Sequence, residues 1–506
     1  MSEAINHLDQ VISVESPDLK LIVTDTVADS RSLSEEYFAL RKKVIEMPKI
    51  EGQLLKDVQQ DTAQWALSNS QLGLDKPFTY EDYAIPSKQK ISERFELLAE
   101  YLVSAHPDVI SEDEVDASRM FIESSFAMYE ETPSDGSIHA DADGSFAFVV
   151  PTRLSRKSTE YGEEVEPIMP VLRYLPNELR AAFAVGLPPL ILDTYSRETD
   201  GKRGYLVLSP IWTDMMEDLD WGDAANAALA RVNDTVNFAY GRLGAEVQGL
   251  GAIIPALTKF GQHIENKNVI TTTGHGGTIQ LIMNTIDRAI EEEYITKEQT
   301  KKVGVLGLGS IGRSIAEIIR DHLPDAEISV YDIREEQTRK VAASIGGIVA
   351  GSVAEVIRDS EVIISAVTSH IDIEEIGLTA EDVENKLFID DSQPCSLTPE
   401  QVEKLGGTVA WVIGKNGIER SSYNFGGSMA DDTKEVFGCE AEAATIAATY
   451  RDLQASGIDK ETAKEMIKDI ALRSPVDPEK VRKIAKVFAT YNVEAAPLQA
   501  FGKYLR

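Results

Sequence analysis

Apolar residues in the first third of the chain recur at the three- and four-residue spacing of amphipathic helices. The pattern is clearest over residues 32–47 and 91–103, where one face of each helix would be apolar and the other polar. These segments predict that residues 1–165 form a mainly helical or α+β domain. Residues 153–167 are polar and of mixed charge, so they are the best candidate for a linker to the rest of the chain.

Two short apolar runs near the end of this domain have the length of strands. They cover residues 120–129 and 145–150 and are separated by a polar stretch that contains Asp, Gly and Pro. Such an arrangement indicates a strand, a loop and a second strand. We therefore expect a β-hairpin over residues 120–150.

The pattern changes from about residue 168. Residues 203–212 are strand-like, and residues 221–244 form an alanine-rich helical pattern. A later short strand runs into a Thr/Gly turn and then into an amphipathic helix that starts near Thr278. We assign residues 168–300 to a segment that binds substrate and contributes to catalysis.

Residues 301–435 alternate short apolar runs with helical patterns. The apolar runs lie at residues 303–306, 327–331, 360–369, 386–394 and 408–414. Strands that alternate with helices in this way build a parallel sheet covered by helices. The expected fold class is α/β, with a Rossmann-like doubly wound parallel sheet after the amino-terminal domain. We expect residues 436–506 to form helices that pack on the substrate domain.

A glycine-rich turn follows the first of these strands and opens a helix. Its residues are Gly307, Leu308, Gly309, Ser310, Ile311 and Gly312. Gly307 allows the tight turn, Gly309 lets the backbone approach a pyrophosphate, and Gly312 lets the helix pack closely on the strand. With the free N–H groups of the helix N-terminus, this turn predicts a site for NAD or NADP.

Asp332 ends the second strand, 20 residues beyond Gly312. A carboxylate at this distance binds the ribose 2′-hydroxyl and repels a 2′-phosphate, so it favours NAD. Arg334 could bind that phosphate instead, which leaves NADP as the alternative. The turns after later strands, at Thr368 and at residues 390–395, belong to the ligand-bearing edge of a parallel sheet. Their polar groups could equally be satisfied within the turns.

Composition limits the classes of partner. The 506 residues include 84 Asp and Glu against 50 Lys and Arg, a formal net charge of −34. Affinity for a phosphate backbone rests on Lys and Arg, so no nucleic-acid partner is expected. The amino end lacks the features of a signal peptide, no apolar run is long enough to span a bilayer, and two cysteines are too few for a disulfide framework. We expect a cytoplasmic protein.

One of the two cysteines, Cys439, opens a helical pattern over residues 435–453. The dipole and free N–H groups of a helix N-terminus lower the pKa of a thiol and favour a nucleophilic thiolate. The alternative is a small buried residue between helix and sheet. The seven histidines are scattered without paired spacing, so no metal site is expected.

Several motifs occur in order in the second part of the chain. They are the strand region 203–216, LGAIIPALTKF before the Thr272-Thr273-Gly274 turn, the glycine fingerprint, FGCEAEA at 437–443 and the final segment 476–500. Over about residues 203–500 the chain thereby resembles the cyanobacterial long-chain acyl-ACP reductases, whose catalytic element reads F-x-C-x-A-E-A. Residues 1–165 have no counterpart in that family.

The resemblance implies NAD(P)H-dependent reduction of an acyl thioester to an aldehyde. Cys439 would attack the carbonyl, expel the carrier thiol and form an acyl-enzyme for hydride to reduce. Glu442, one helical turn further, would either orient a catalytic group or water or only balance charge. His275 stands two positions before the histidine of the family's T-T-G-N-T-H-T turn, so an acid or base role and a cofactor-positioning role both stay open. The family places arginine, which suits NADP, where this chain has Asp332.

The acyl donor is either acyl-CoA or an acyl carrier protein. Carrier proteins are usually acidic, so a chain with a net charge of −34 repels them unless a basic patch intervenes. Candidate patches are residues 41–43 and Arg153 with Arg156 and Lys157. The added amino-terminal domain could reshape substrate access or make the protein a homo-oligomer.

Two other functions fit parts of the same pattern. One is an NAD-dependent dehydrogenase of a small amino or hydroxy acid, with direct hydride transfer and a structural Cys439. The other is a non-catalytic nucleotide-sensing protein whose amino-terminal domain binds a partner. A long apolar tunnel to Cys439 would favour the thioester reductase, a compact cationic pocket the dehydrogenase, and an occluded thiol the sensor.

Overall fold

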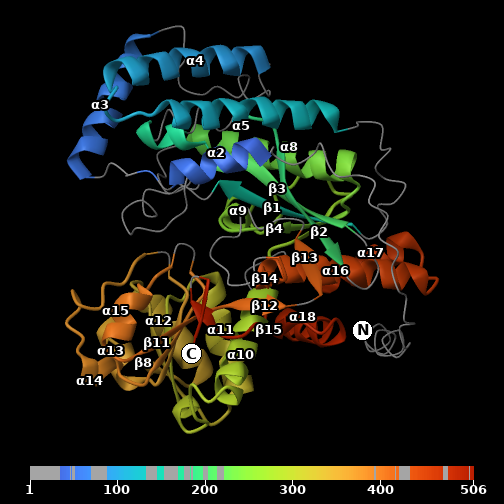
Figure 1. Cartoon of the computed structure of the whole chain (residues 1–506). Coiled ribbons are helices and arrows are strands. Elements are labelled where there is room, and N and C mark those ends of the chain that lie inside the picture. Colours follow the sequence, from blue (N-terminus) through green and yellow to red (C-terminus); the bar gives the residue numbers. More distant parts are fainter. Residues whose placement is uncertain are drawn as a thin grey trace.

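Two six-stranded sheets form the framework of the protein. In Figure 1 the first sheet lies below a layer of amino-terminal helices, and carboxy-terminal helices lie between this sheet and the second one. Among the described residues, no helix is long and apolar enough to cross a membrane. The computed structural model describes residues 35–45, 47, 52–69, 88–132, 145–152, 169–175, 180, 183, 186–197, 203–212, 222–367, 369–392, 395–415, 417–420, 433–470, 477–500 and 502–505.

The second sheet is entirely parallel, with the order β8-β7-β6-β9-β10-β11. Its strands are β6 (Lys302–Leu306), β7 (Glu327–Tyr331), β8 (Ile348–Val349), β9 (Val362–Ser365), β10 (Leu387–Asp390) and β11 (Thr408–Trp411). The connecting helices are α11 (Ser310–His322), α12 (Glu335–Ile345), α13 (Val353–Asp359), α14 (Ala380–Val383) and α15 (Pro399–Lys404). This strand order is that of the doubly wound dinucleotide-binding fold, so the predicted fold class is confirmed.

The first sheet is mixed, with the order β13-β2-β3-β1-β4-β5. Its strands are β1 (Phe146–Thr152), β2 (Leu190–Arg197), β3 (Arg203–Trp212), β4 (Val247–Leu250), β5 (Ile270–Thr272) and β13 (Ile418–Arg420). Strand β1 precedes residue 165, where the sequence suggested a domain boundary, yet it pairs with β3 and β4. The predicted linker, residues 153–167, lies outside the described residues.

The prediction of a hairpin over residues 120–150 is wrong in its first half. Residues 120–129 belong to helix α5 (Glu112–Glu131), which begins at a capping box formed by Ser111 and Glu114. Buried positions of α5 include a set at helical spacing: Val115, Ser118, Phe121, Ile122, Ser125 and Phe126. The cap fixes the helix upstream of the apolar run, and β1 pairs in parallel with other strands instead of turning back.

The amino-terminal helices, together with two later helices, cover the first sheet (Figure 1). They are α2 (Glu35–Ile45), α3 (Gly52–Ser68), α4 (Lys88–Ala105), α5, the 3-10 helix η4 (Pro170–Tyr174) and α8 (Gly222–Leu243). The helices predicted at residues 32–47 and 91–103 are present as α2 and α4. Because the buried side chains of these helices join those of both sheets in one continuous core, this layer is packed as part of the same body.

A third layer lies between the two sheets (Figure 1). Its helices are α10 (His275–Glu291), α16 (Gly438–Ala455), α17 (Lys460–Ile470) and α18 (Pro478–Thr490), and its small sheet has the order β14-β12-β15. The remaining short elements are α9 (Ile254–Leu257), η6 (Gln299–Lys301), β12 (Ile413–Lys415), β14 (Glu435–Phe437), β15 (Glu494–Ala495), β16 (Gln499–Ala500) and β17 (Lys503–Tyr504). Helix α16 packs on β1 and β4 of the first sheet and on α10.

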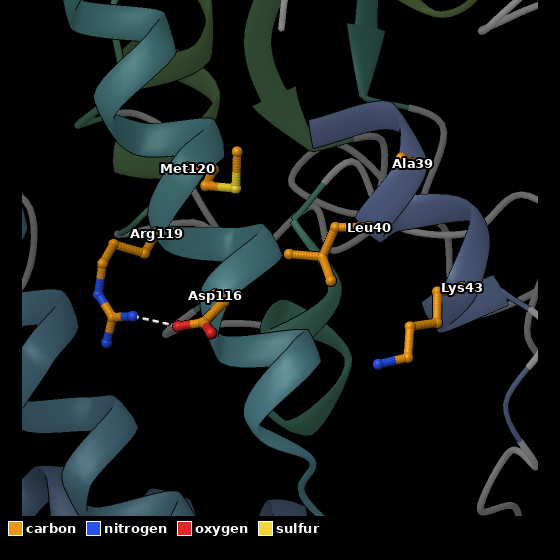
Figure 2. A pocket seen from close by; sticks show the side chains of 6 residues that line it. All are labelled: Ala39, Leu40, Lys43, Asp116, Arg119 and Met120. Carbon is orange, nitrogen blue, oxygen red and sulfur yellow. Dashed lines mark hydrogen bonds and ion pairs between the residues drawn. The ribbon is translucent and has the colours of Figure 1, made fainter. Parts of the chain in front are cut away.

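A groove of about 510 Å³ lies between α2 and α5, on the amino-terminal layer (Figure 2). Its lining residues are Ala39, Leu40, Lys43, Asp116, Arg119 and Met120. The charges around it are paired, since Lys43 binds Asp113 and Arg119 binds Asp116. The groove contains none of the residues predicted for the dinucleotide or thiol site.

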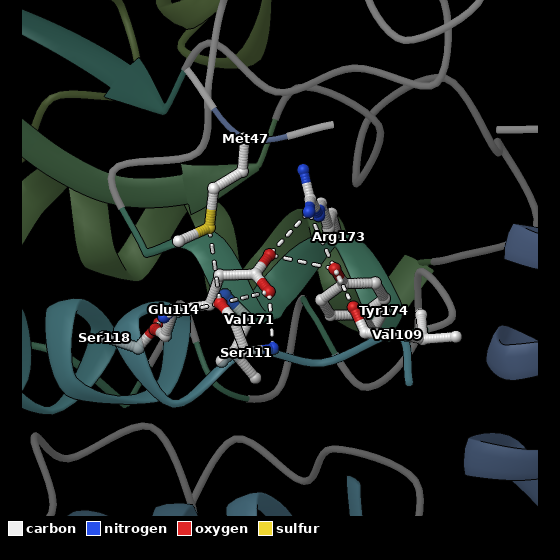
Figure 3. A network of polar contacts seen from close by, with 8 residues as sticks. All are labelled: Met47, Val109, Ser111, Glu114, Ser118, Val171, Arg173 and Tyr174. Atoms are coloured by element: carbon white, nitrogen blue, oxygen red, sulfur yellow. Dashed lines mark hydrogen bonds and ion pairs between the residues drawn. The ribbon is translucent and has the colours of Figure 1, made fainter. Parts of the chain in front are cut away.

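A buried ion pair joins α5 to η4 (Figure 3). The Glu114 carboxylate is 2% exposed and accepts hydrogen bonds from the Arg173 guanidinium and, at 2.8 Å, from the Tyr174 hydroxyl. Its second oxygen accepts from the Ser111 N–H and hydroxyl, each at 2.9 Å. One carboxylate thus caps α5 and neutralises the buried guanidinium.

We expect Glu114→Ala to lower the free energy of unfolding by about 3–5 kcal/mol, because it leaves the Arg173 charge buried without its counter-ion. The matched control is Glu96→Ala on α4, which removes an exposed pair with Arg119 and should cost less than about 1 kcal/mol. Urea unfolding followed by circular dichroism measures both. Equal losses for the two variants would contradict this role of Glu114.

Candidate active site

The glycine turn between β6 and α11 has the geometry of a pyrophosphate site. Gly307 has φ of +80°, and a Cβ there would lie 2.6 Å from the Ala366 carbonyl oxygen. A Cβ on Gly312 would lie 1.8 Å from the Gly307 carbonyl oxygen, whereas one on Gly309 would meet no heavy atom within 4 Å. The turn therefore needs glycine for its own packing at two positions, and at Gly309 it leaves open space for a ligand to approach the backbone.

The N-terminus of α11 offers polar groups to that space. The Ser310 hydroxyl is buried and has no hydrogen-bond partner among the described residues. Ile311 packs against the core and anchors the first turn of the helix. An orphaned hydroxyl beside free helix N–H groups suits a phosphate oxygen. The residues at this turn therefore fit a dinucleotide.

Asp332 follows β7, and its carboxylate joins the glycine turn to Arg334. It accepts a hydrogen bond from the Leu308 N–H at 2.7 Å, and the Arg334 guanidinium binds it through two nitrogens at 2.8 and 2.9 Å. These bonds, that from Arg334 first, lower the pKa of Asp332 to about 2. The predicted pair of Asp332 and Arg334 is thus a single unit at the ribose end of the site. The predicted cofactor residue Thr368 lies outside the described residues.

Cys439 stands in the first turn of α16, in the layer between the two sheets. Two residues earlier, Phe437 pairs with Ile413 of β12, which follows β11 of the dinucleotide sheet directly. On the other side, a Cβ added to Gly274 would lie 2.1 Å from the Cys439 Cβ. The thiol is therefore placed where α10, α16 and the edge of the second sheet meet.

The environment of Cys439 reverses one expectation from the sequence. Helix α16 does begin at the cysteine, but burial raises the thiol pKa well above its usual range. The nearby carboxyls of Glu440, Asp391 and Glu442 raise the pKa further, while a hydrogen bond from the Glu440 N–H opposes them. The expected lowering by the helix terminus is outweighed, so the resting group is the thiol.

Glu442 lies in the contact between α16 and α10. Its carboxyl group is buried and accepts hydrogen bonds from the Thr272 hydroxyl and, at 2.6 Å, from the Gly277 N–H. The backbone groups of Gly274 and Gly276 also interact with it. Burial raises its pKa, and these hydrogen bonds counteract the rise. Glu442 therefore caps the N-terminus of α10.

His275 is the first residue of α10, and its ring meets the Phe260 ring edge-on at 5.9 Å. Burial lowers the pKa of His275 to about 4, so the imidazole is neutral at pH 7. Its Nδ1 has no hydrogen-bond partner among the described residues, and neither does the Thr273 hydroxyl, which is 2% exposed. Two unpaired polar groups therefore lie on the turn that contacts Cys439.

Two consecutive carboxyls, Asp390 and Asp391, begin the turn at residues 390–395 that the sequence assigned to the ligand-bearing edge, although neither was predicted as a site residue. Asp390 is buried, and its carboxylate accepts hydrogen bonds from the backbone of the following turn. The carboxyl of Asp391 makes no hydrogen bond to any described residue, and its charge acts on Cys439. The available signal was their position directly after a buried strand, at the edge where ligands bind.

The remaining candidate features are the second cysteine and a metal site. Cys395 is buried against Trp411, Ile413 and Ala496. Over the ranges that the structure describes, no group of three or more His, Cys, Asp or Glu side chains is arranged to bind a metal ion.

The fold and the glycine turn define an NAD(P)-binding domain with the fold of NAD(P)-dependent oxidoreductases. The family model described as "NADP oxidoreductase coenzyme F420-dependent" matches residues 302–394. This range contains the glycine turn, Asp332 and Asp391. No curated protein matches the chain significantly.

Several solved structures are similar to parts of the chain. An imine reductase from Bacillus cereus BAG3X2 is 21% identical over 22% of this chain and 39% of its own, with a TM-score of 0.18. A dipicolinate synthase chain from Bacillus halodurans is 20% identical over 32% and 56%, with a TM-score of 0.23. L-tryptophan dehydrogenase from Nostoc punctiforme is 13% identical over 69% and 88%, with a TM-score of 0.29. The chain thus spans about two fifths of the imine reductase.

We expect Gly277→Ala to separate α10 from α16, because its Cβ would lie 2.2 Å from the Gly438 carbonyl oxygen. The cost should be about 1–3 kcal/mol in unfolding free energy, with faster labelling of Cys439 by iodoacetamide. The control is Gly241→Ala in α8, where a Cβ meets no heavy atom within 4 Å and should stabilise by about 0.5–1 kcal/mol. Unchanged labelling in Gly277→Ala would refute the contact.

Proposed function

We propose that the protein reduces an acyl thioester to an aldehyde with NAD(P)H, through an acyl group held on Cys439. The observation that carries the proposal is the position of this thiol. It lies between the two sheets, in contact with the turn that follows the first sheet and beside the carboxyl edge of the dinucleotide sheet. Acyl transfer to a thiol and hydride transfer to the same carbon need such a shared location.

The sheet register supports a common site for thiol and dinucleotide. Leu306, Ser365 and Asp390 stand side by side as the last residues of β6, β9 and β10. The glycine turn continues from the first of these strands. Ligands of doubly wound sheets bind in the crevice outside the carboxyl ends, where the strand order reverses. Here that point lies between β6 and β9, and β10 with Asp390 is the next strand.

The first step exchanges one thioester for another. The Cys439 sulfur bonds to the acyl carbon, the bond from that carbon to the carrier sulfur breaks, and the thiol proton leaves with the carrier thiol. The unpaired Thr273 hydroxyl and the positive end of the α16 dipole can stabilise the oxyanion that develops. His275 is neutral at pH 7 because its pKa is about 4, so it adds no positive charge to stabilise a resting thiolate.

The other predicted site residues position groups instead of reacting with the substrate. Glu442 positions the turn at Gly274 by capping α10 and is not itself placed against the substrate. The dinucleotide turn and the Asp332–Arg334 pair orient the cofactor, which supplies hydride when bound.

Acyl-CoA and acyl carrier protein both remain candidate donors of the acyl group. In the described part of α2, Lys43 is already paired with Asp113, which weakens the case for a carrier-protein patch there.

Incubation with acyl-CoA and acyl-carrier thioesters without cofactor should add one acyl mass to the protein. Cys439→Ala should show no adduct and lose NAD(P)H-dependent aldehyde formation, whereas Cys395→Ala serves as the matched thiol control and should retain both. Intact-mass spectrometry and aldehyde trapping measure the two steps. The proposal fails if no thioester acylates the wild-type protein or if Cys439→Ala still forms aldehyde.

A second candidate is a nucleotide-sensing protein without catalysis. The raised pKa and partial burial of Cys439 favour it, because a thiol in that state is a poor nucleophile until a bound substrate changes its surroundings. The same acylation experiment distinguishes the two. Nucleotide binding without any acyl adduct would support the sensor.

We further propose that NADH is preferred over NADPH. The Asp332 carboxylate, with its pKa near 2, stays ionised and repels a 2′-phosphate. Asp332→Ala should weaken NADH binding by about tenfold or more and remove the preference, because Arg334 is then free to bind the phosphate. Fluorescence titration with both cofactors measures this. Tighter binding of NADPH by the wild-type protein would refute it.

A further inference from the structure

Two adjacent carboxyls at the end of β10 differ in their surroundings. The Asp390 carboxylate accepts hydrogen bonds from the N–H groups of Ser392, Ser396 and Leu397, at 2.9, 2.7 and 3.2 Å. It therefore has a structural task in holding the turn. The Asp391 side chain makes no hydrogen bond to any described residue, while its N–H donates to the Ser365 carbonyl oxygen at 3.3 Å. Its backbone is fixed to β9, and its carboxyl is left for another partner.

The backbone places Asp391 beside the dinucleotide crevice and next to Asp390, which pairs with Trp411 of β11. Its backbone bond to Ser365 places it beside β9, and β9 is the neighbour of β6, which ends at the glycine turn. Two strand spacings amount to about 10 Å, so Asp391 borders the crevice. Toward the third layer, the ring of Trp411 in β11 contacts the ring of Phe437 at 6.3 Å. Cys439 follows Phe437 by two residues, and the charge of Asp391 raises the pKa of its thiol.

The other two carboxyls near the thiol have partners of their own. Glu440 accepts hydrogen bonds from the Tyr195 hydroxyl at 2.9 Å and from the Phe437 N–H at 3.0 Å. Glu442 is bound to the N-terminus of α10. The His275 imidazole is neutral and carries no proton that it readily gives up. Asp391 is the carboxyl near Cys439 that the described residues leave without a hydrogen bond.

Asp391 is also the group whose protonation suits proton delivery. Burial, with the charge of neighbouring Asp390, raises the pKa of Asp391 well above its usual range. A carboxyl in this state is protonated at a pH where an ordinary Asp is ionised. The charge of Asp391 in turn raises the pKa of Cys439.

We propose that Asp391 is the general acid of the thioester reduction, the group that returns a proton to the Cys439 sulfur when aldehyde is released. The inference rests on the proposed function, because it requires an acyl group on Cys439.

The proton balance defines when this acid acts. Acylation consumes no proton, since the thiol proton leaves with the carrier. After the acyl carbon has received hydride, the carbon–oxygen double bond re-forms, the carbon–sulfur bond breaks and its electron pair stays on sulfur. The Asp391 proton passes to that sulfur, which regenerates the thiol, and water then reprotonates the carboxylate. One proton is taken up for each aldehyde formed.

Asp391→Asn separates the two halves of the reaction, because an amide of the same shape has no proton to give. Acylation by acyl-CoA without cofactor should proceed within about twofold of wild type. With NADH, aldehyde turnover should fall about 100-fold or more, after a burst of cofactor oxidation of about one equivalent. Asp391→Glu, which keeps an acid, should recover turnover to within about tenfold of wild type.

Asp325→Asn is the matched control, because Asp325 is exposed and precedes β7 at the opposite edge of the same sheet. It should leave both steps unchanged. Should the amide disturb the turn, as judged by NADH titration, Asp391→Ser provides the same test. Turnover within threefold of wild type in a folded Asp391→Asn or Asp391→Ser variant overturns the role of Asp391 while leaving Cys439 acylation standing. Failure of the wild-type protein to acylate overturns the proposed function and this inference together.

Discussion

The contact between the first turns of α10 and α16 is the constraint on which the candidate site depends. Gly274, Gly277 and Gly438 allow backbone to lie against backbone there, and the Glu442 carboxyl occupies the N-terminus of the facing helix. Helix α10 follows β5, an edge strand of the first sheet, and leads to β6 of the second sheet. A shift of this contact would therefore move the thiol relative to both sheets at once.

Burial of the candidate site also determines the protonation of its side chains. Burial raises the pKa values of Cys439, Glu442 and Asp391, and it lowers that of His275. Every one of these shifts favours the neutral form, as expected where water is excluded. Charge that develops during a reaction would meet hydrogen-bond donors that are already oriented and need little reorganisation. Electrostatic stabilisation is most effective under these conditions. The cost is a thiol with little intrinsic reactivity at rest.

Features set by local sequence were predictable, and features set by tertiary packing were not. The glycine turn and Asp332 were identified because tight turns and strand ends need specific residues at fixed spacing. Residues 120–129 were assigned wrongly as a strand, since a short apolar run does not distinguish the two periods and the deciding cap at Ser111 lies outside it. The direction of the Cys439 pKa shift depends first on burial of the thiol, and in part on the charge of Asp391 from a distant segment, so no local pattern could give it.

One strand that precedes residue 165 belongs to the first sheet. Strand β1 lies between β3 and β4, with its residues paired to both, and α16 packs directly on β1. A Cβ on Gly249 would meet Phe148 of β1 at 2.6 Å and Ala443 of α16 at 2.8 Å. The helix that carries the thiol is thus seated on a strand that precedes residue 165. A change in β1 would therefore be transmitted to this helix through direct packing.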